Sequence, residues 1–194
     1  MVIAAMGTSL TARGAWLQEL PTALEALVRR PVRARNFARI GATSRWGLAV
    51  VDDVARARPD IAIIEFASND AALHRRVSLA ESAANVTAII RRLRTADGNI
   101  RLHLMTMSPA IGLRGLLRPR LGRYYDLYPS LSARERTGLI DNRPDWEALP
   151  PANLVRALPD GSHPTAEFAV SITLANVVRT LARDLGVAAP RGTL

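Results

Sequence analysis

Three side chains near opposite ends of the sequence have the types that activate a hydroxyl group for attack on an acyl carbon. Ser9 stands in the segment 7–11, Gly-Thr-Ser-Leu-Thr, directly after a short apolar run. Asp160 and His163 stand three residues apart in the segment 160–165, Asp-Gly-Ser-His-Pro-Thr. At that spacing, the carboxylate can hold one imidazole nitrogen while the other accepts the proton of the serine. These residue types indicate nucleophilic acyl transfer.

Acyl transfer also requires N–H donors for the negative charge that forms on the attacked carbonyl oxygen. Ser9 and Gly41 can offer backbone N–H groups, and Asn69 offers a side-chain amide. Each of these residues could instead serve only as a turn or helix-capping residue, and Asp160 with His163 could form a structural turn pair. The chemical interpretation therefore depends on whether the fold brings all five together.

The elements that must position these residues alternate between strand and helix. Short apolar runs bounded by turn residues predict strands at 2–6, 32–37, 60–66, 100–107 and 138–140. Apolar residues at helical spacing predict helices at 16–30, about 48–58, 78–94 and 123–131. A final helix is expected to have Pro164 in its first turn and to end near Gly186, after a long proline-rich loop at 141–162.

This alternation predicts an α/β fold: a three-layer α/β/α sandwich around a parallel sheet of about five strands, of the flavodoxin-like type. The 194 residues are enough for one domain (1–194), with a core at about 2–186 and a C-terminal tail at 187–194. In such sheets the ligand site lies beyond the carboxyl ends of the strands. The candidate residues all follow strands or lie in late loops, so we expect them to converge on one edge.

Four ordered blocks resemble the SGNH (GDSL) hydrolase family: Gly-Thr-Ser-Leu-Thr at 7–11, Ile-Gly-Ala-Thr-Ser at 40–44, Ser-Asn-Asp at 68–70 and Asp-Gly-Ser-His-Pro-Thr at 160–165. The resemblance covers residues 2 to about 185. It implies that Ser9 is the nucleophile, that Asp160 and His163 are its proton-handling partners, and that Ser9, Gly41 and Asn69 form the oxyanion hole. It also implies a serine ester hydrolase that works through an acyl-enzyme intermediate. No cofactor and no metal are expected.

Three positions depart from the family pattern. Thr8 replaces the usual aspartate of the first block, Ala38 a glycine of the second, and Ala67 the glycine before the asparagine block. None of these removes a group of the proton relay. We expect the loss of charge at Thr8 to alter how the site is organised, and Ala67 to narrow the space near the acyl group.

The net charge of +9 comes from 26 basic residues, all of them arginine, and 17 acidic ones. Two denser clusters, 29–39 and 114–123, could attract anionic partners, although a solvated basic surface explains them as well. No nucleic-acid-binding motif accompanies them, so no nucleic acid partner is expected. A basic module that binds anionic partners without catalysis is the alternative from another class of protein.

Other classes of protein fit the sequence less well. It contains no cysteine, and His74 and His103, interpreted as a surface and a strand residue, lack partner motifs for a metal site. Nucleotide-binding glycine motifs are missing, and so is the Gly-x-Ser-x-Gly elbow. The apolar runs are too short to span a membrane. No leader segment precedes the first block, so we expect a cytoplasmic location, or secretion if a leader was removed.

The expected substrates are small acyl esters, such as acetyl groups on carbohydrates. A thioesterase or a lysophospholipase is the enzymatic alternative. Segment 111–128, rich in arginine, leucine and tyrosine, is predicted to border the site as a mobile cover that favours acidic or amphiphilic substrates, or to be a basic surface helix. The sequence leaves the oligomeric state open.

Overall fold

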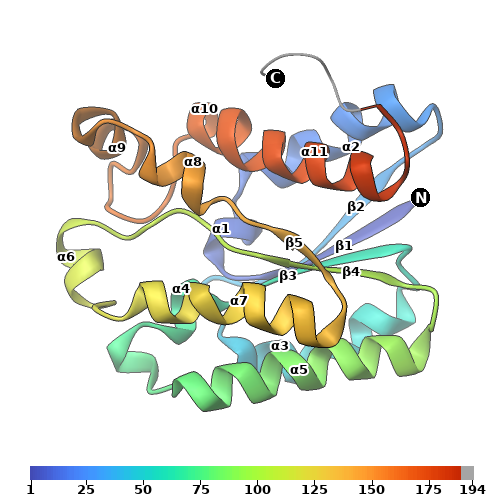
Figure 1. Cartoon of the computed structure of the whole chain (residues 1–194), viewed down its shortest axis with the longest axis horizontal. Coiled ribbons are helices and arrows are strands. Elements are labelled where there is room, and N and C mark those ends of the chain that lie inside the picture. Colours follow the sequence, from blue (N-terminus) through green and yellow to red (C-terminus); the bar gives the residue numbers. More distant parts are fainter. Residues whose placement is uncertain (189–194) are drawn as a thin grey trace.

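A five-stranded parallel sheet forms the centre of the computed structural model, which describes residues 1–188 (Figure 1). The strand order is β2-β1-β3-β4-β5, with bounds β1 Val2–Gly7, β2 Arg33–Ala38, β3 Ile61–Glu65, β4 Arg101–Met105 and β5 Gly138–Ile140. All neighbouring strands pair in parallel. The predicted single-domain three-layer α/β sandwich is confirmed. Of the predicted tail 187–194, residues 189–194 lie outside the described residues.

Helices cover both faces of the sheet. One layer contains α2 (Ala15–Val28), α10 (Ala166–Phe168), the π-helix η2 (Ala169–Leu174) and α11 (Ala175–Asp184). The other contains α3 (Ser44–Arg56), α5 (Leu79–Ala96) and α7 (Leu121–Glu135), which pack side by side (Figure 1). Short helices α1 (Ser9–Ala12), α4 (Ala67–Asp70), η1 (Leu73–Arg75), α6 (Gly112–Leu116), α8 (Arg143–Glu147) and α9 (Pro151–Ala157) occupy the connections.

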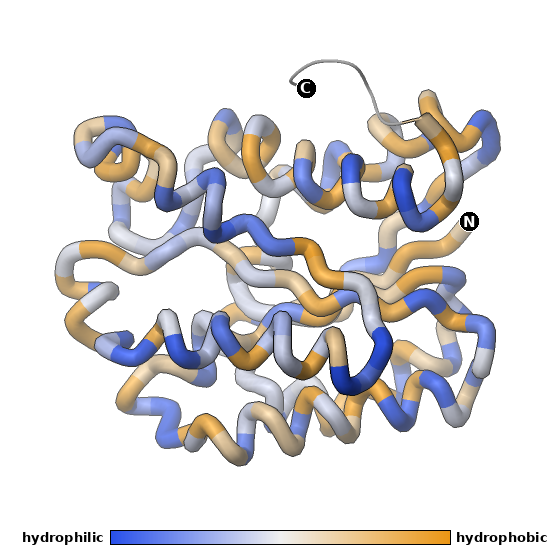
Figure 2. Tube along the Cα trace, in the orientation of Figure 1, coloured by the Kyte–Doolittle hydropathy of each residue, from blue (hydrophilic) through white to orange (hydrophobic). Residues whose placement is uncertain are grey.

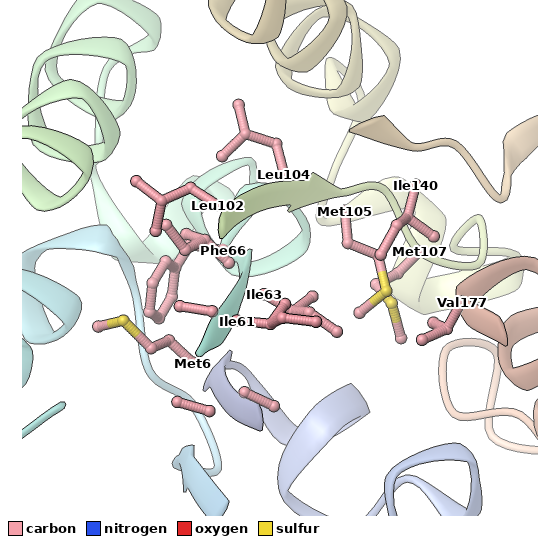
Figure 3. Packing of buried hydrophobic residues seen from close by; sticks show 14 of the residues in the cluster. Met6, Ile61, Ile63, Phe66, Leu102, Leu104, Met105, Met107, Ile140 and Val177 are labelled. Atoms are coloured by element: carbon pink, nitrogen blue, oxygen red, sulfur yellow. The ribbon is translucent and has the colours of Figure 1, made fainter. Parts of the chain in front are cut away.

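The core lies on both sides of the central strands. Every residue of β3 is buried, as expected for a strand covered on both faces, and Figure 2 shows hydrophobic stretches along the strands between helices of mixed character. Figure 3 shows Met105, Met107 and Ile140 beside Val177 of α11. None of the helices among the described residues is both long enough and apolar enough to cross a bilayer.

Two predicted helix starts are wrong. The helix expected from about residue 48 begins at Ser44, because Asp70 accepts the N–H of Ser44 from across the chain and caps α3. The last helical segment begins at Ala166 after the cap residue Thr165, so Pro164 precedes it. Thr165 is the N-cap of this helix: its own backbone is extended, and its carbonyl accepts the first helical hydrogen bond, from the N–H of Ala169.

The segment 141–162 is not a continuous loop, because it contains α8 and α9. Both helices have a proline in their first turn, where the missing proline N–H is not needed. The prolines that suggest a loop in the sequence are therefore helix-starting residues here. This segment packs Trp146 into a second small apolar cluster with Phe168.

Candidate active site

The first strand delivers Ser9 to the carboxyl edge of the sheet. β1 ends at Gly7, Thr8 caps α1 by accepting the N–H of Leu10 at 3.2 Å, and Ser9 is the first residue of that helix. N–H groups in the first turn of a helix have no acceptor within the helix. The side chain and the N–H of Ser9 therefore both lie at a helix start, next to the carboxyl edge of the sheet.

Ser9, His163 and Asp160 form a continuous hydrogen-bonded series. The Oγ of Ser9 lies 2.7 Å from Nε2 of His163, and Nδ1 of His163 lies 2.6 Å from Oδ2 of Asp160. With a carboxylate at Nδ1, that nitrogen carries the proton and Nε2 is the acceptor. Residues 154 positions apart in the sequence thus meet through their side chains.

The turn that carries Asp160 and His163 is fixed by its own backbone. Oδ1 of Asp160 accepts the N–H groups of Ser162 and His163 at 2.9 and 2.7 Å, and Gly161 adopts a φ of 82°, which favours glycine. Partial burial raises the pKa of Asp160, but these N–H groups and the His163 ring outweigh it and lower that pKa to about 2. The carboxylate is therefore charged at neutral pH.

Two of the three expected N–H donor positions are linked through a neighbouring residue: the Asn69 side chain is bonded to Ala42, which follows Gly41 in the chain. Gly41 follows β2 with a φ of 74°, and its N–H donates to no other group within residues 1–188. The Nδ2 of Asn69, on α4 after β3, donates to the carbonyl of Ala42 at 2.9 Å. β1 lies between β2 and β3 in the sheet, so Ser9, Gly41 and Asn69 follow the ends of three adjacent strands.

Asp70, the last residue of the Ser-Asn-Asp block, bonds two helices of the same layer and does not cap the helix that follows it. Its buried carboxylate accepts the N–H of Ser44 at 2.8 Å and the hydroxyl of Ser82 at 2.6 Å. It therefore ties α3 and α5 together behind Asn69. Ala67 is buried, donates its N–H to the hydroxyl of Tyr128, and is not among the residues that line the cavity beside Ser9.

Glu65 anchors the start of the helix that carries Ser9, a placement that the sequence interpretation missed. Its carboxylate accepts the Thr8 N–H at 2.7 Å and the hydroxyls of Thr8 and Thr11 at 2.9 and 2.7 Å. Burial raises the pKa of Glu65 to about 7, against the lowering effect of these hydrogen bonds. The available signal was a lone glutamate at the end of the otherwise apolar run Ile-Ala-Ile-Ile-Glu.

Gly7 allows that carboxylate to approach the strand end. A Cβ at Gly7 would collide with the Glu65 side chain. Thr8, which stands where the family has aspartate, thus donates to a carboxylate on the neighbouring strand instead of supplying one. That the loss of charge at Thr8 alters how the site is organised stays a prediction.

The segment 111–128 borders the site, as predicted. The Ile111 N–H donates to the Gly161 carbonyl at 2.8 Å, and the Arg114 guanidinium lies 3.7 Å from the Asp160 carboxylate. On the other side, the Leu73 N–H donates to the Leu117 carbonyl at 3.0 Å. Helix α6 therefore bridges the Asp160 turn and the segment after α4, and Figure 1 shows it projecting at this edge.

A small cavity opens beside the three side chains. It has a volume of about 200 Å³ and is lined by Ser9, Leu10, Arg13, Gly14, Trp16, Met107, Asp160, His163, Pro164, Ala169 and Thr173. Ligand pockets for drug-sized molecules are commonly about 300–1,000 Å³. The space beside Ser9 is thus small for a ligand pocket.

The two remaining histidines lie as predicted. His103 is buried within β4, with Nε2 3.5 Å from the Asp184 carboxylate, and His74 is exposed on η1. Within residues 1–188, no group of three or more histidine, aspartate or glutamate side chains is arranged to hold a metal ion.

A serine, an imidazole and a carboxylate in hydrogen-bonded series at the carboxyl edge of a parallel sheet define a serine-hydrolase type of α/β protein. The sequence model of the GDSL-like lipase/acylhydrolase family matches residues 5–169, so the chain belongs to this family. The resemblance inferred from the four blocks is confirmed. The protein is therefore a carboxylic ester hydrolase of the GDSL/SGNH type.

Solved structures show the same fold over nearly the whole chain. The lipase/acylhydrolase from Enterococcus faecalis is similar with a TM-score of 0.80 and 20% identity, covering 98% of this chain and 99% of that one. The acetylxylan esterase from Geobacillus stearothermophilus has a TM-score of 0.76 and 18% identity, with coverages of 98% and 96%. The psychrotrophic esterase from Pseudoalteromonas sp. has a TM-score of 0.74 and 20% identity, with coverages of 95% and 98%. A search of curated protein sequences finds no match.

Proposed function

We propose that Ser9 is the nucleophile of an ester hydrolase, with His163 as general base and Asp160 as the group that orients it. The supporting observation is the series of two short hydrogen bonds, 2.7 Å from Ser9 to His163 and 2.6 Å from His163 to Asp160. A general base must lie within hydrogen-bond reach of the proton that it removes. The proposal covers residues on β1–α1 and on the turn before α10.

The reaction proceeds in two halves. His163 removes the Ser9 proton as Oγ bonds to the ester carbon, and the carbonyl oxygen becomes negative beside the N–H groups of Ser9, Gly41 and Asn69. The bond to the alcohol then breaks, and the alkoxide takes the proton from His163. Water, deprotonated by His163 in turn, attacks the acyl-serine and releases the carboxylic acid and free Ser9.

The proposed substrates are esters of small acyl groups, including acetyl groups on carbohydrates. The cavity of about 200 Å³ beside Ser9 supports this proposal, because its lining by Trp16, Met107 and the Asp160 turn leaves room for a small group. A structural relative is an acetylxylan esterase by name, which makes acetylated xylo-oligosaccharides a reasonable first test.

A second candidate is hydrolysis of an amphiphile with an anionic head, as a thioesterase or lysophospholipase would perform. Leu113 and Leu116 of α6 are 80% and 73% exposed and lie on either side of Arg114, next to the Asp160 turn. Exposed apolar side chains in a group often mark a binding surface. This arrangement favours a substrate with both an apolar chain and negative charge.

The experiment for the nucleophile is Ser9→Ala assayed on p-nitrophenyl acetate and with a fluorophosphonate probe. We expect turnover to fall at least about 10³-fold and labelling to disappear, with an unchanged thermal unfolding temperature. Ser130→Ala, at an exposed serine of α7, is the matched control and retains both. Undiminished turnover or labelling in Ser9→Ala contradicts the assignment.

Substrate class is decided by comparing acetylated xylo-oligosaccharides, p-nitrophenyl esters of graded chain length, acyl-CoA and lysophospholipid. The small-acyl proposal predicts that kcat/KM is highest for acetyl esters and falls with chain length. A maximum at long chains, reduced by the double variant Leu113→Ser with Leu116→Ser, supports the amphiphile instead.

A further inference from the structure

Arg118 differs from every other arginine of the cluster 114–123. Arg114, Arg120 and Arg123 are exposed, whereas Arg118 is only 7% exposed. It lies between α6 and α7, and its guanidinium is buried against α4, the helix that carries Asn69. No feature of the sequence separates this arginine from its neighbours.

The guanidinium of Arg118 donates two hydrogen bonds to the Ser-Asn-Asp block at 68–70. Its Nε donates to the carbonyl of Ser68 at 2.8 Å, and one terminal nitrogen donates to Oδ1 of Asn69 at 3.2 Å. The other terminal nitrogen donates to the Arg114 carbonyl at 3.3 Å. The planar guanidinium thus holds both the backbone and the side chain of α4 in a fixed relation.

All three acceptors of Arg118 are neutral oxygens. Burying a charged side chain without a directly bonded carboxylate is costly, and here burial lowers the pKa of Arg118. Arg114 and Arg75 add to this cost, because their positive charges act on the same group. We therefore expect the buried charge of Arg118 to serve the site beside it, unlike the charges of the exposed arginines nearby.

The orientation of the Asn69 amide is the property that Arg118 controls. A side-chain amide can rotate to exchange its oxygen and nitrogen. The guanidinium has only donors, so it holds the Asn69 oxygen toward itself. The Nδ2 of Asn69 then points the other way and donates to the carbonyl of Ala42, the residue after Gly41. The second N–H of Nδ2 is then available to a substrate oxygen.

We propose that Arg118 is a positioning residue of the oxyanion hole, which fixes Asn69 so that its N–H donor, and not its carbonyl oxygen, faces the reacting oxygen. The proposal rests on the role of Asn69 proposed above. A rotated amide would present a negative dipole end to a negative oxygen, so Arg118 acts on the transition state more than on substrate binding. It also makes the segment between α6 and α7 part of the active-site scaffold.

The test is a double-mutant cycle between Arg118→Met and Asn69→Ala, assayed on p-nitrophenyl acetate. Arg118→Met is expected to lower kcat about 10- to 100-fold with KM changed less than about threefold, since a misplaced donor costs part of what a missing one costs. In the Asn69→Ala background the same change is expected to lower kcat less than about threefold further. Equal losses in both backgrounds overturn the proposal, because Arg118 would then act independently of Asn69.

Two further variants separate positioning from charge and from stability. Arg118→Lys keeps the charge but cannot bond both Ser68 and Asn69 through one planar fork, so we expect it to recover at most a small part of the lost kcat. Arg123→Met removes an exposed arginine from the same segment and is expected to retain full activity. Full activity in Arg118→Lys would show that charge alone matters and would contradict the positioning role.

A measurement that needs no turnover keeps this inference separate from the proposed function. In the wild-type protein, the ¹⁵N-edited NMR signal of the Asn69 side-chain NH₂ should show slow hydrogen exchange; in Arg118→Met it should shift and exchange faster. An unchanged signal overturns the inference even if esters are hydrolysed. A changed signal without any ester turnover supports the hold on Asn69, while the proposed function alone fails.

Discussion

Two carboxylates are bonded to the groups around Ser9, Asp160 to the His163 turn and Glu65 to Thr8 and Thr11 at the start of α1, and each accepts hydrogen bonds from three donor groups. Asp160 receives the N–H groups of Ser162 and His163 and the His163 ring, whereas Glu65 receives the N–H and hydroxyl of Thr8 and the hydroxyl of Thr11. The Asp160 side chain is 43% exposed and its pKa is about 2; Glu65 is 1% exposed and its pKa is raised to about 7.

The number of hydrogen bonds therefore does not decide the charge of these groups. Burial opposes ionisation in both, but only in Glu65 is it complete enough to outweigh three donors. The half-exposed carboxylate of Asp160 can stabilise a positively charged imidazole during the reaction. The buried carboxylate of Glu65 holds the start of α1. The same chemical group is suited to proton handling on one side and to anchoring on the other.

The largest effect that tests this contrast is expected from Asp160→Asn. The amide keeps the shape but cannot stabilise a protonated His163, so kcat should fall about 10³- to 10⁴-fold. Stability should fall only modestly, because water screens the contribution of this half-exposed carboxylate. Kinetics on p-nitrophenyl acetate and thermal unfolding measure the two. Asp52→Asn, at an exposed position of α3, is the control. A loss of kcat below about tenfold would place Asp160 outside the relay.

The raised pKa of Glu65 should make the free energy of unfolding depend on pH. Its pKa is higher in the folded protein than the ordinary value of 4.5, so the folded state binds this proton more tightly than the unfolded state. The contribution of Glu65 to the free energy of unfolding should be greatest below about pH 4.5 and should decline by about 3 kcal/mol as pH rises through about 7. Asp160 changes in the opposite sense and in a lower window, losing its contribution as pH falls toward about 2.

Glu65→Gln isolates that decline, because it removes the titration and keeps nearly the same volume. Denaturant unfolding of the wild type and the variant between pH 4.5 and 8 gives the difference directly. The variant should lack the decline that the wild type shows. Parallel curves for the two proteins would mean that Glu65 is already ionised at low pH and that burial does not control it.

A smaller change is expected from Thr8→Asp, which introduces the residue that the family usually has. Here it would place a second carboxylate against Glu65, and we expect a destabilisation of about 2 kcal/mol at pH 8 that shrinks at pH 5, where Glu65 can hold a proton. Combining it with Glu65→Gln should recover most of the loss. No recovery would show that the repulsion comes from elsewhere.

The sequence was sufficient to predict the order of strands and helices and the meeting of Ser9, Asp160 and His163. Those predictions rest on periodicity and on ordered motifs, which local sequence contains. The start of α3 at Ser44 was not predictable in this way, because its cap is a carboxylate 26 residues further on. Local propensity likewise treats the prolines of 141–162 as loop residues, although in α8 and α9 they begin helices.

The supporting side chains of the site were missed for a related reason. Glu65 and Arg118 act through burial, and burial is a property of the assembled molecule. A glutamate closing an apolar strand was a usable signal, since charged residues are seldom fully buried without partners. Nothing comparable marks Arg118 within a segment that contains three other arginines.

The smallest expected effect concerns Arg114, a residue of α6 that lies beside the half-exposed carboxylate of Asp160. Its guanidinium lies 3.7 Å from Oδ2 of Asp160, and the two side chains are 46% and 43% exposed. Water screens an ion pair of this kind, so Arg114→Gln should change stability by less than about 1 kcal/mol.

Activity of Arg114→Gln on a neutral ester should change less than about threefold at physiological salt. The change should vanish at high salt, since screening removes what remains of the attraction. The assay is kcat/KM on p-nitrophenyl acetate at two salt concentrations, with Arg123→Gln as the control. A salt-independent loss of tenfold or more would mean that Asp160 depends on Arg114, and that its charge is maintained by a partner on α6 as well as by its own turn.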